Sequence, residues 1–71
     1  METETITITV NGFDERLPAG IDLERLIAHL KEGDTDLIVE HNGRFVYPKD
    51  YPLTELVPGD RVELINPNFG G

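Results

Sequence analysis

One short segment has the periodicity of an amphipathic helix, and this helix constrains the fold more than any other feature of the sequence. In residues 21–33, IDLERLIAHLKEG, apolar side chains recur at the spacing of one helix face: Leu23, Leu26, Ile27 and Leu30. Asp22 is the expected N-cap and Gly33 the expected C-terminal stop. Because the helix has one apolar stripe, the sequence predicts that it covers one face of a sheet.

The segment before this helix has the pattern of a β-hairpin. In residues 5–10, TITITV, isoleucine and valine alternate with threonine, which is typical of a half-buried strand. Asn11-Gly12 then supplies residues that suit the positive φ angles of a tight turn. A two-residue turn places Glu15 on the apolar face, which indicates either an edge strand or a longer loop. Pro18 is expected to end the return strand, because proline cannot donate a hydrogen bond to the sheet.

The segment after the helix predicts a second hairpin, in LIVEHNGRFVY, residues 37–47, around its own Asn-Gly pair. If Glu40 faces solvent, strand alternation turns Val39 toward the core and places Val46 opposite it. Both hairpins therefore have one apolar face available to the helix.

The remaining sequence predicts an irregular turn and one more strand. Leu53 and Leu56 are expected to pack the turn of residues 49–57 against the core. Pro-Gly-Asp at residues 58–60 favours a tight turn, and residues 61–65, RVELI, alternate like a strand. The element order is then strand, strand, helix, strand, strand, turn, strand.

This order predicts an α+β fold in which the first and last strands lie side by side and parallel, with the helix in the crossover between them. The expected architecture is a β-grasp, or ubiquitin-like, fold: a mixed sheet of about four to five strands packed on one helix.

Composition restricts the classes of partner. The 71 residues suffice for one domain, and without cysteine the chain has neither a disulfide nor a catalytic thiol. Six basic and fourteen acidic residues give a net charge of −8, which argues against nucleic acid and anionic lipid and suits a basic partner surface. The apolar runs are too short to span a membrane, and METETIT does not resemble a secretory signal, so a cytoplasmic location is expected.

The side chains do not suggest an active site. His29 and His41 have no second histidine at ligand spacing, so no metal site is predicted. Pro67 is expected to stop the last strand, which divides the chain into a domain of residues 1–67 and a flexible tail of residues 68–71, NFGG. A tail that ends in two glycines suits a carboxylate that must enter a narrow cleft of another enzyme and be activated there as an anhydride with AMP.

Several motifs together resemble a known family. ITVNG, the LPAG before the helix, VEHNG, TELVPGDRVELI and the terminal GG cover nearly the whole chain. In this order they resemble the bacterial sulfur carriers of the ThiS/MoaD type, which include the thiamine-type carrier ThiS and the small subunit of molybdopterin synthase. The short length and single helix are most similar to the thiamine type.

The resemblance implies a cycle centred on the C-terminal Gly70-Gly71. A partner enzyme uses ATP to adenylate the Gly71 carboxylate, and a sulfur donor such as a cysteine desulfurase or persulfide protein converts it to a thiocarboxylate. The thiocarboxylate then donates sulfur, with thiazole synthase of thiamine biosynthesis as the expected acceptor. The chain would be a protein co-substrate, not an enzyme, with no tightly bound cofactor, and a monomer when free.

Other acceptors and one other class of function stay open at this point. The tail INPNFGG, with its proline, also resembles that of the molybdopterin subunit, and related carriers feed sulfur into amino-acid biosynthesis. A β-grasp domain could also be a ubiquitin-like protein modifier or a non-covalent interaction module.

Strand alternation predicts where a partner docks. If the last strand turns Val62 and Leu64 inward, Ile65 faces outward, and the same parity places Ile38, Phe45 and Tyr47 on that outer face. A soluble domain rarely exposes several large apolar side chains together without use. The partner-binding residues are therefore predicted to be the following: Ile38, Phe45, Tyr47, Ile65 and, in the tail, Phe69. The alternative is that sheet twist and the turn of residues 49–57 bury some of these side chains, which would then not be available to a partner.

Overall fold

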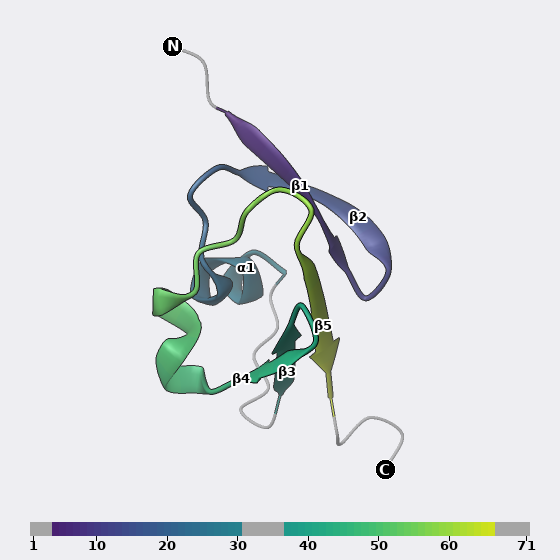
Figure 1. Ribbon diagram of the computed structural model, residues 1–71. Helices are drawn as coiled ribbons and strands as arrows, with labels where there is room; N and C mark the ends of the chain where they lie inside the picture. Colours follow the sequence, from purple (N-terminus) through teal and green to yellow (C-terminus); the bar gives the residue numbers. More distant parts are fainter. Residues whose placement is uncertain (1–3, 31–36, 67–71) are drawn as a thin grey trace.

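The computed structural model describes residues 4–30 and 37–66, and it shows a five-stranded mixed sheet with one α-helix (Figure 1). The elements in chain order are β1 (Thr5–Val10), β2 (Phe13–Pro18), α1 (Leu23–His29), β3 (Ile38–His41), β4 (Arg44–Val46), a 3-10 helix η1 (Pro48–Leu53) and β5 (Arg61–Ile65). The strand order in the sheet is β2-β1-β5-β3-β4.

The centre of the sheet is the parallel pair of β1 and β5, in which Thr9 lies beside Arg61 and Val10 beside Val62. All other neighbouring strands are antiparallel. The two hairpins therefore lie on opposite sides of β5, as Figure 1 shows, and α1 lies within the crossover between them. The expected α+β fold of the β-grasp type is confirmed.

The first hairpin turns in two residues. Asn11 and Gly12 have φ angles of 51° and 86°, the left-handed values that this turn requires. The register pairs Val10 with Phe13 and Ile8 with Glu15, so Glu15 does fall on the inner side. Because β2 is an edge strand, Glu15 is only half-buried there, which resolves the conflict seen in the sequence without a longer loop.

The helix α1 begins where the sequence predicts and ends earlier. The Asp22 carboxylate accepts a hydrogen bond from the backbone N–H of Arg25 at 2.9 Å and so caps the first turn. The helix ends at His29, and Leu30 is its C-cap, so the helix does not run on to the stop expected at Gly33. Gly33 itself lies outside the described residues.

The core lies between α1 and the inner face of the sheet. It consists of fully or nearly fully buried apolar side chains: Ile6, Ile8, Val10, Leu17, Ile21, Leu23, Leu26, Val39, Leu56 and Val62. Leu56 packs here as predicted, but the prediction for Leu53 is wrong, because that side chain is 79% exposed. Tyr51 of the same 3-10 helix packs against the core in its place, since the helical turn directs Leu53 outward.

Candidate functional site

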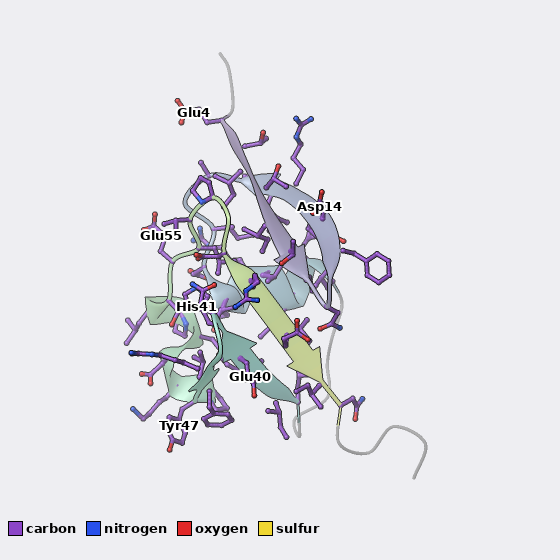
Figure 2. The ribbon with its side chains drawn as sticks, turned by 45° about the vertical axis from the view of Figure 1, so that its right-hand side comes forward. Glu4, Asp14, Glu40, His41, Tyr47 and Glu55 are labelled. Carbon is purple, nitrogen blue, oxygen red and sulfur yellow. The ribbon has the colours of Figure 1, made fainter. Side chains whose placement is uncertain are left out.

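The outer face of the sheet lies opposite α1, and the strand registers arrange its side chains in rows. Ile38 of β3 is the direct neighbour of Ile65 of β5. Val39 pairs with Val46, and the same register brings Tyr47, which has an extended backbone, beside Ile38. We call Tyr47, Ile38 and Ile65 the apolar row; Figure 2 shows the side chain of Tyr47.

The apolar row and Phe45 are accessible to a partner. Phe45, Tyr47 and Ile65 are 51%, 59% and 42% exposed, whereas Ile38 is half-buried between its neighbours. The rings of Phe45 and Tyr47 meet edge to face with centroids 4.7 Å apart, and Lys49 Nζ lies 5.9 Å from the Tyr47 ring centroid. The two aromatic rings therefore contact each other on the outer face. The structure thus places the four residues on one outer face; their partner-binding role stays a prediction.

A second row of the outer face is charged. Glu40 of β3 has Phe45 as its neighbour on one side and Glu63 of β5 on the other. We call Glu40 and Glu63 the acidic pair. They line a shallow depression together with Gly43 and Arg61, and the side chain of Glu40 is labelled in Figure 2.

The strand β5 connects this face to the C-terminal segment. It ends at Ile65, within the apolar row, so the chain leaves the sheet from the predicted partner-binding surface. Phe69, Gly70 and Gly71 lie outside the described residues, as does Pro67, and the division of the chain into residues 1–67 and 68–71 stays a prediction.

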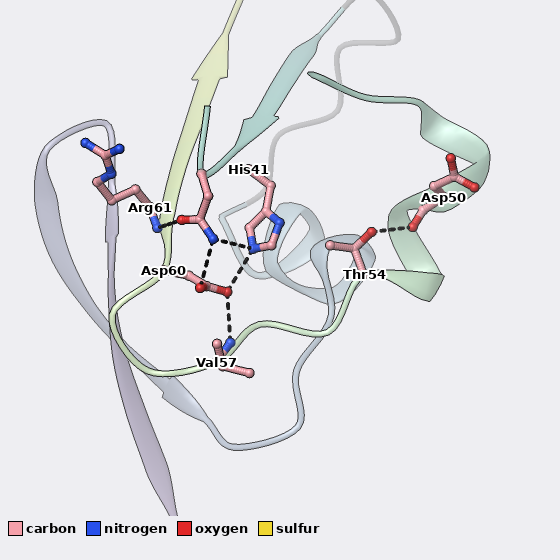
Figure 3. A network of polar contacts seen from close by, with 7 residues as sticks. His41, Asp50, Thr54, Val57, Asp60 and Arg61 are labelled. Atoms are coloured by element: carbon pink, nitrogen blue, oxygen red, sulfur yellow. Dashed lines mark hydrogen bonds and ion pairs between the residues drawn. The ribbon is translucent and has the colours of Figure 1, made fainter. Parts of the chain in front are cut away.

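A polar network at the other end of β5 was not anticipated from the sequence (Figure 3). The Asp60 carboxylate, 6% exposed, accepts hydrogen bonds from His41 Nε2 at 2.8 Å, Asn42 Nδ2 at 3.1 Å and the Val57 backbone N–H at 3.0 Å. Asn42 Oδ1 in turn accepts from the Arg61 backbone N–H at 2.8 Å. The network therefore fastens the β3–β4 turn to the start of β5.

The surroundings of Asp60 favour its ionised form. Burial alone would raise the pKa of this carboxyl group. The hydrogen bonds from His41, the Val57 N–H and Asn42, with the positive charge of a protonated His41, outweigh burial and lower the pKa below its ordinary value of 3.8. His41 is therefore the partner of a structural carboxylate. The available sequence signal was weak, since both Asn42 and Asp60 also suit turns.

The described part of the chain holds no metal-binding cluster of histidine, aspartate and glutamate side chains. None of the helices in residues 4–30 and 37–66 combines the length and the apolar character that crossing a membrane requires. The features that stand out are thus the outer face and the strand that leads from it to the C-terminal segment.

Comparison with known proteins identifies the family to which this chain belongs. The model of the ThiS family matches residues 3–71, and so extends over both hairpins, the helix and the terminal glycines. The chain belongs to the ThiS family. Proteins of the ThiS family are small sulfur carriers and not catalytic enzymes, so the sulfur-carrier resemblance seen in the sequence is confirmed.

One solved structure supports the same assignment. The crystal structure of the thiamine biosynthesis protein ThiS from Geobacter metallireducens is similar to this chain with a TM-score of 0.81 and 26% sequence identity. The match covers 93% of this chain and 100% of the other. No curated protein sequence matches the chain. The shared fold extends the ThiS family assignment from sequence to three-dimensional structure.

Proposed function

We propose that this chain is a sulfur carrier whose Gly71 carboxylate is adenylated by a partner enzyme and converted to a thiocarboxylate, which supplies sulfur for the thiazole of thiamine. The observation that carries the proposal is the match of the ThiS family model over residues 3–71, which includes both terminal glycines. The similarity to a thiamine biosynthesis protein favours the thiamine pathway over the molybdopterin and amino-acid pathways.

The chemistry takes three steps. A carboxylate oxygen of Gly71 attacks the α-phosphorus of ATP, and pyrophosphate leaves. The terminal sulfur of a persulfide then attacks the acyl carbon, and AMP leaves. A second thiol reduces the resulting acyl disulfide, so that the sulfur remains on the chain as a thiocarboxylate. The partner enzyme binds ATP and supplies every catalytic group, and the carrier holds no cofactor of its own.

The sequence of the tail suits this role. Gly70 and Gly71 have no Cβ, so they fit a narrow channel and leave the carbonyl open to attack from either side. Ordering such residues costs conformational entropy, which docking of the folded body offsets. A partner that binds the folded domain therefore positions the tail, although the tail itself contributes little to the binding free energy.

The outer face is the proposed docking surface. Phe45 and the apolar row offer exposed apolar side chains beside the end of β5, and Phe69 would extend the contact along the tail. The adenylating enzyme and thiazole synthase would bind this surface in turn, with the carrier a cytoplasmic monomer between the two encounters.

The experiment uses the full chain, ATP and the adenylating enzyme of a ThiS-family carrier, with intact mass spectrometry as the readout. The mass of the chain is expected to increase by that of AMP minus one water molecule. When a persulfide donor and a thiol are then added, the chain is expected to lose AMP and to carry one sulfur in place of one carboxylate oxygen. Addition of thiazole synthase and its substrates should return the chain to its original mass.

Two variants test the terminus itself. A chain with one alanine added after Gly71 and a chain without Gly71 are expected to fold as the wild type does, by circular dichroism and thermal unfolding, yet to remain unmodified. Adenylation of the extended chain without prior cleavage would contradict the proposal, because the reaction requires Gly71 to be the free end.

A further inference from the structure

The acidic pair is placed where it does not favour folding. Glu40 and Glu63 lie directly opposite each other on antiparallel neighbours β3 and β5 and point to the same outer face. Like charges in this position repel each other and destabilise a sheet. Among the described residues, neither carboxylate forms an ion pair, and the nearby Arg61 forms none either. Within the described residues, no ion pair therefore offsets this repulsion.

The surroundings of the pair suit an incoming cationic side chain. Phe45 is the cross-strand neighbour of Glu40, and its side chain is half exposed on the same outer face. Gly43 lines the depression without a side chain, so access from solvent is open. A guanidinium group can bond two carboxylates with its planar fork and stack on an aromatic ring, which an ammonium group does less well.

We propose that the enzyme that adenylates Gly71 inserts an arginine side chain into this depression, between Glu40 and Glu63 and beside Phe45. The inference rests on the proposed function and names the chemistry of the docking partner. A bound metal ion fits the site less well, because the described residues hold no cluster of three metal ligands there.

The register also fixes where this arginine lies on the partner. Glu63 and Ile65 are two residues apart on β5, so the acidic pair is about 7 Å from the apolar row, farther from the tail. A partner surface that receives Ile65 must therefore carry its arginine about one side-chain row away from the tail channel. The net charge of −8 attracts a basic surface at long range, and the acidic pair selects its orientation.

The test compares three variants that each remove one negative charge. Glu40→Gln and Glu63→Gln alter the acidic pair, and Glu24→Gln, on the exposed side of α1 across the molecule, is the matched control. Binding to the adenylating enzyme of a ThiS-family carrier is measured by calorimetry at low and high salt, and thermal unfolding is measured in parallel.

We expect each acidic-pair variant to bind about 10-fold or more weakly, because a hydrogen bond to an ionised group is lost, and the control to bind within about 2-fold of the wild type. Removing the repulsion should leave the melting temperature of these two variants unchanged or higher. The loss of affinity in the double variant should be smaller than the product of the two single-variant losses, because both carboxylates bond the same guanidinium group.

The outcomes separate this inference from the proposed function. Equal binding by all three variants, or an equal loss in all three, would overturn the arginine contact while wild-type adenylation still supports the carrier role. A wild-type chain that the enzyme binds but does not adenylate would overturn the proposed function, and the arginine contact would then be judged by the binding data alone.

Discussion

Replacing Asp60 by alanine is expected to lower the free energy of unfolding by about 2–4 kcal/mol. The carboxylate accepts three hydrogen bonds, from His41, Asn42 and the Val57 N–H, and is 6% exposed. A hydrogen bond to an ionised group contributes about 1.5–3 kcal/mol, and a buried donor left unpaired costs about 1–3 kcal/mol. Three bonds that share one acceptor are not additive, and water reaches the exposed side of Asn42, so the expected total is less than their sum.

The same carboxylate makes stability depend on pH in a defined direction. Its pKa is lower in the folded chain than its ordinary value of 3.8, so the folded state binds a proton less readily than the unfolded state. The stabilisation is therefore fully present above about pH 5. It decreases as the pH falls below 3.8 and is lost once the pH passes through the lowered pKa of the folded state.

Urea unfolding of the wild type and Asp60→Ala at neutral pH measures this loss. The pH dependence is measured by urea unfolding of the wild type and Asp60→Asn at several pH values between about 7 and 3. Because other carboxyl groups titrate in the same range, the informative quantity is the difference in unfolding free energy between the two proteins. This difference should shrink as the pH falls through 3.8 toward the acid end of the range. Asp14→Asn, which removes an exposed carboxylate on the edge strand β2, is the matched control with which the Asp60→Asn difference is compared. A difference for Asp60→Asn that is the same at both ends of the range would refute the reasoning.

Two further predictions concern the core and the outer face. Leu26 is 0% exposed, so Leu26→Ala should cost about 2–5 kcal/mol in urea unfolding, and a loss under about 1 kcal/mol would mean that the helix does not pack as described. Phe45→Asp and Ile65→Asp should weaken binding to the adenylating enzyme far more than they lower the melting temperature, whereas Phe13→Asp, at an aromatic side chain 74% exposed on the first hairpin, should affect neither strongly. If the melting temperature of the Phe45 or Ile65 variant collapses instead, the outer face is part of the core and the partner docks elsewhere.

Sequence reasoning predicted the architecture because each element has a local signal in this chain. Alternation marks β1, two Asn-Gly pairs fix the hairpin registers, and one apolar stripe on α1 requires one sheet face. These signals agree with each other, so few topologies remain. The register of the first hairpin follows from the length of its turn alone, and the half-buried Glu15 follows from the edge position of β2.

The error in the predicted core lies where no period of two or 3.6 residues is present. Between β4 and β5 the chain forms a 3-10 helix with proline at both its start and its interior, and the sequence does not show which side chain such a turn buries. Hydrophobicity alone therefore predicts that Leu53 packs inward, whereas in the structure Tyr51 packs on the core. An aromatic ring buries a large apolar surface, which favours Tyr51 for this contact, and burial raises the pKa of its hydroxyl group.

The His41–Asp60 network escaped prediction for a different reason. Its members are 19 residues apart, and each has a sufficient local explanation as the end of a strand or a turn residue. Only the antiparallel pairing of β3 with β5, which brings His41 opposite Val62, places them together. The outer face, in contrast, was predictable, because alternation along β3, β4 and β5 assigns each residue to a face once one residue of each strand is placed.

The end of β5 that leads to the tail is held on both sides, and Asn11 explains how. On one side β3 pairs with β5 as far as Ile65. On the other side β1 has already entered its turn, so its backbone no longer runs beside Leu64. The Asn11 side chain takes its place: Oδ1 accepts from the Leu64 N–H at 2.8 Å, and Nδ2 donates to the Leu64 carbonyl at 3.3 Å.

Asn11 therefore has two roles that few other residues combine. Its backbone adopts the positive φ of 51° that the hairpin needs, and its amide completes the hydrogen bonding of a strand 53 residues away. Glycine would supply the first role only. Glutamine would lengthen the amide and fits the left-handed conformation poorly. The Asn-Gly pair, which the sequence presents as an ordinary turn, thus also fixes the direction in which β5 delivers the chain toward its C-terminal glycines.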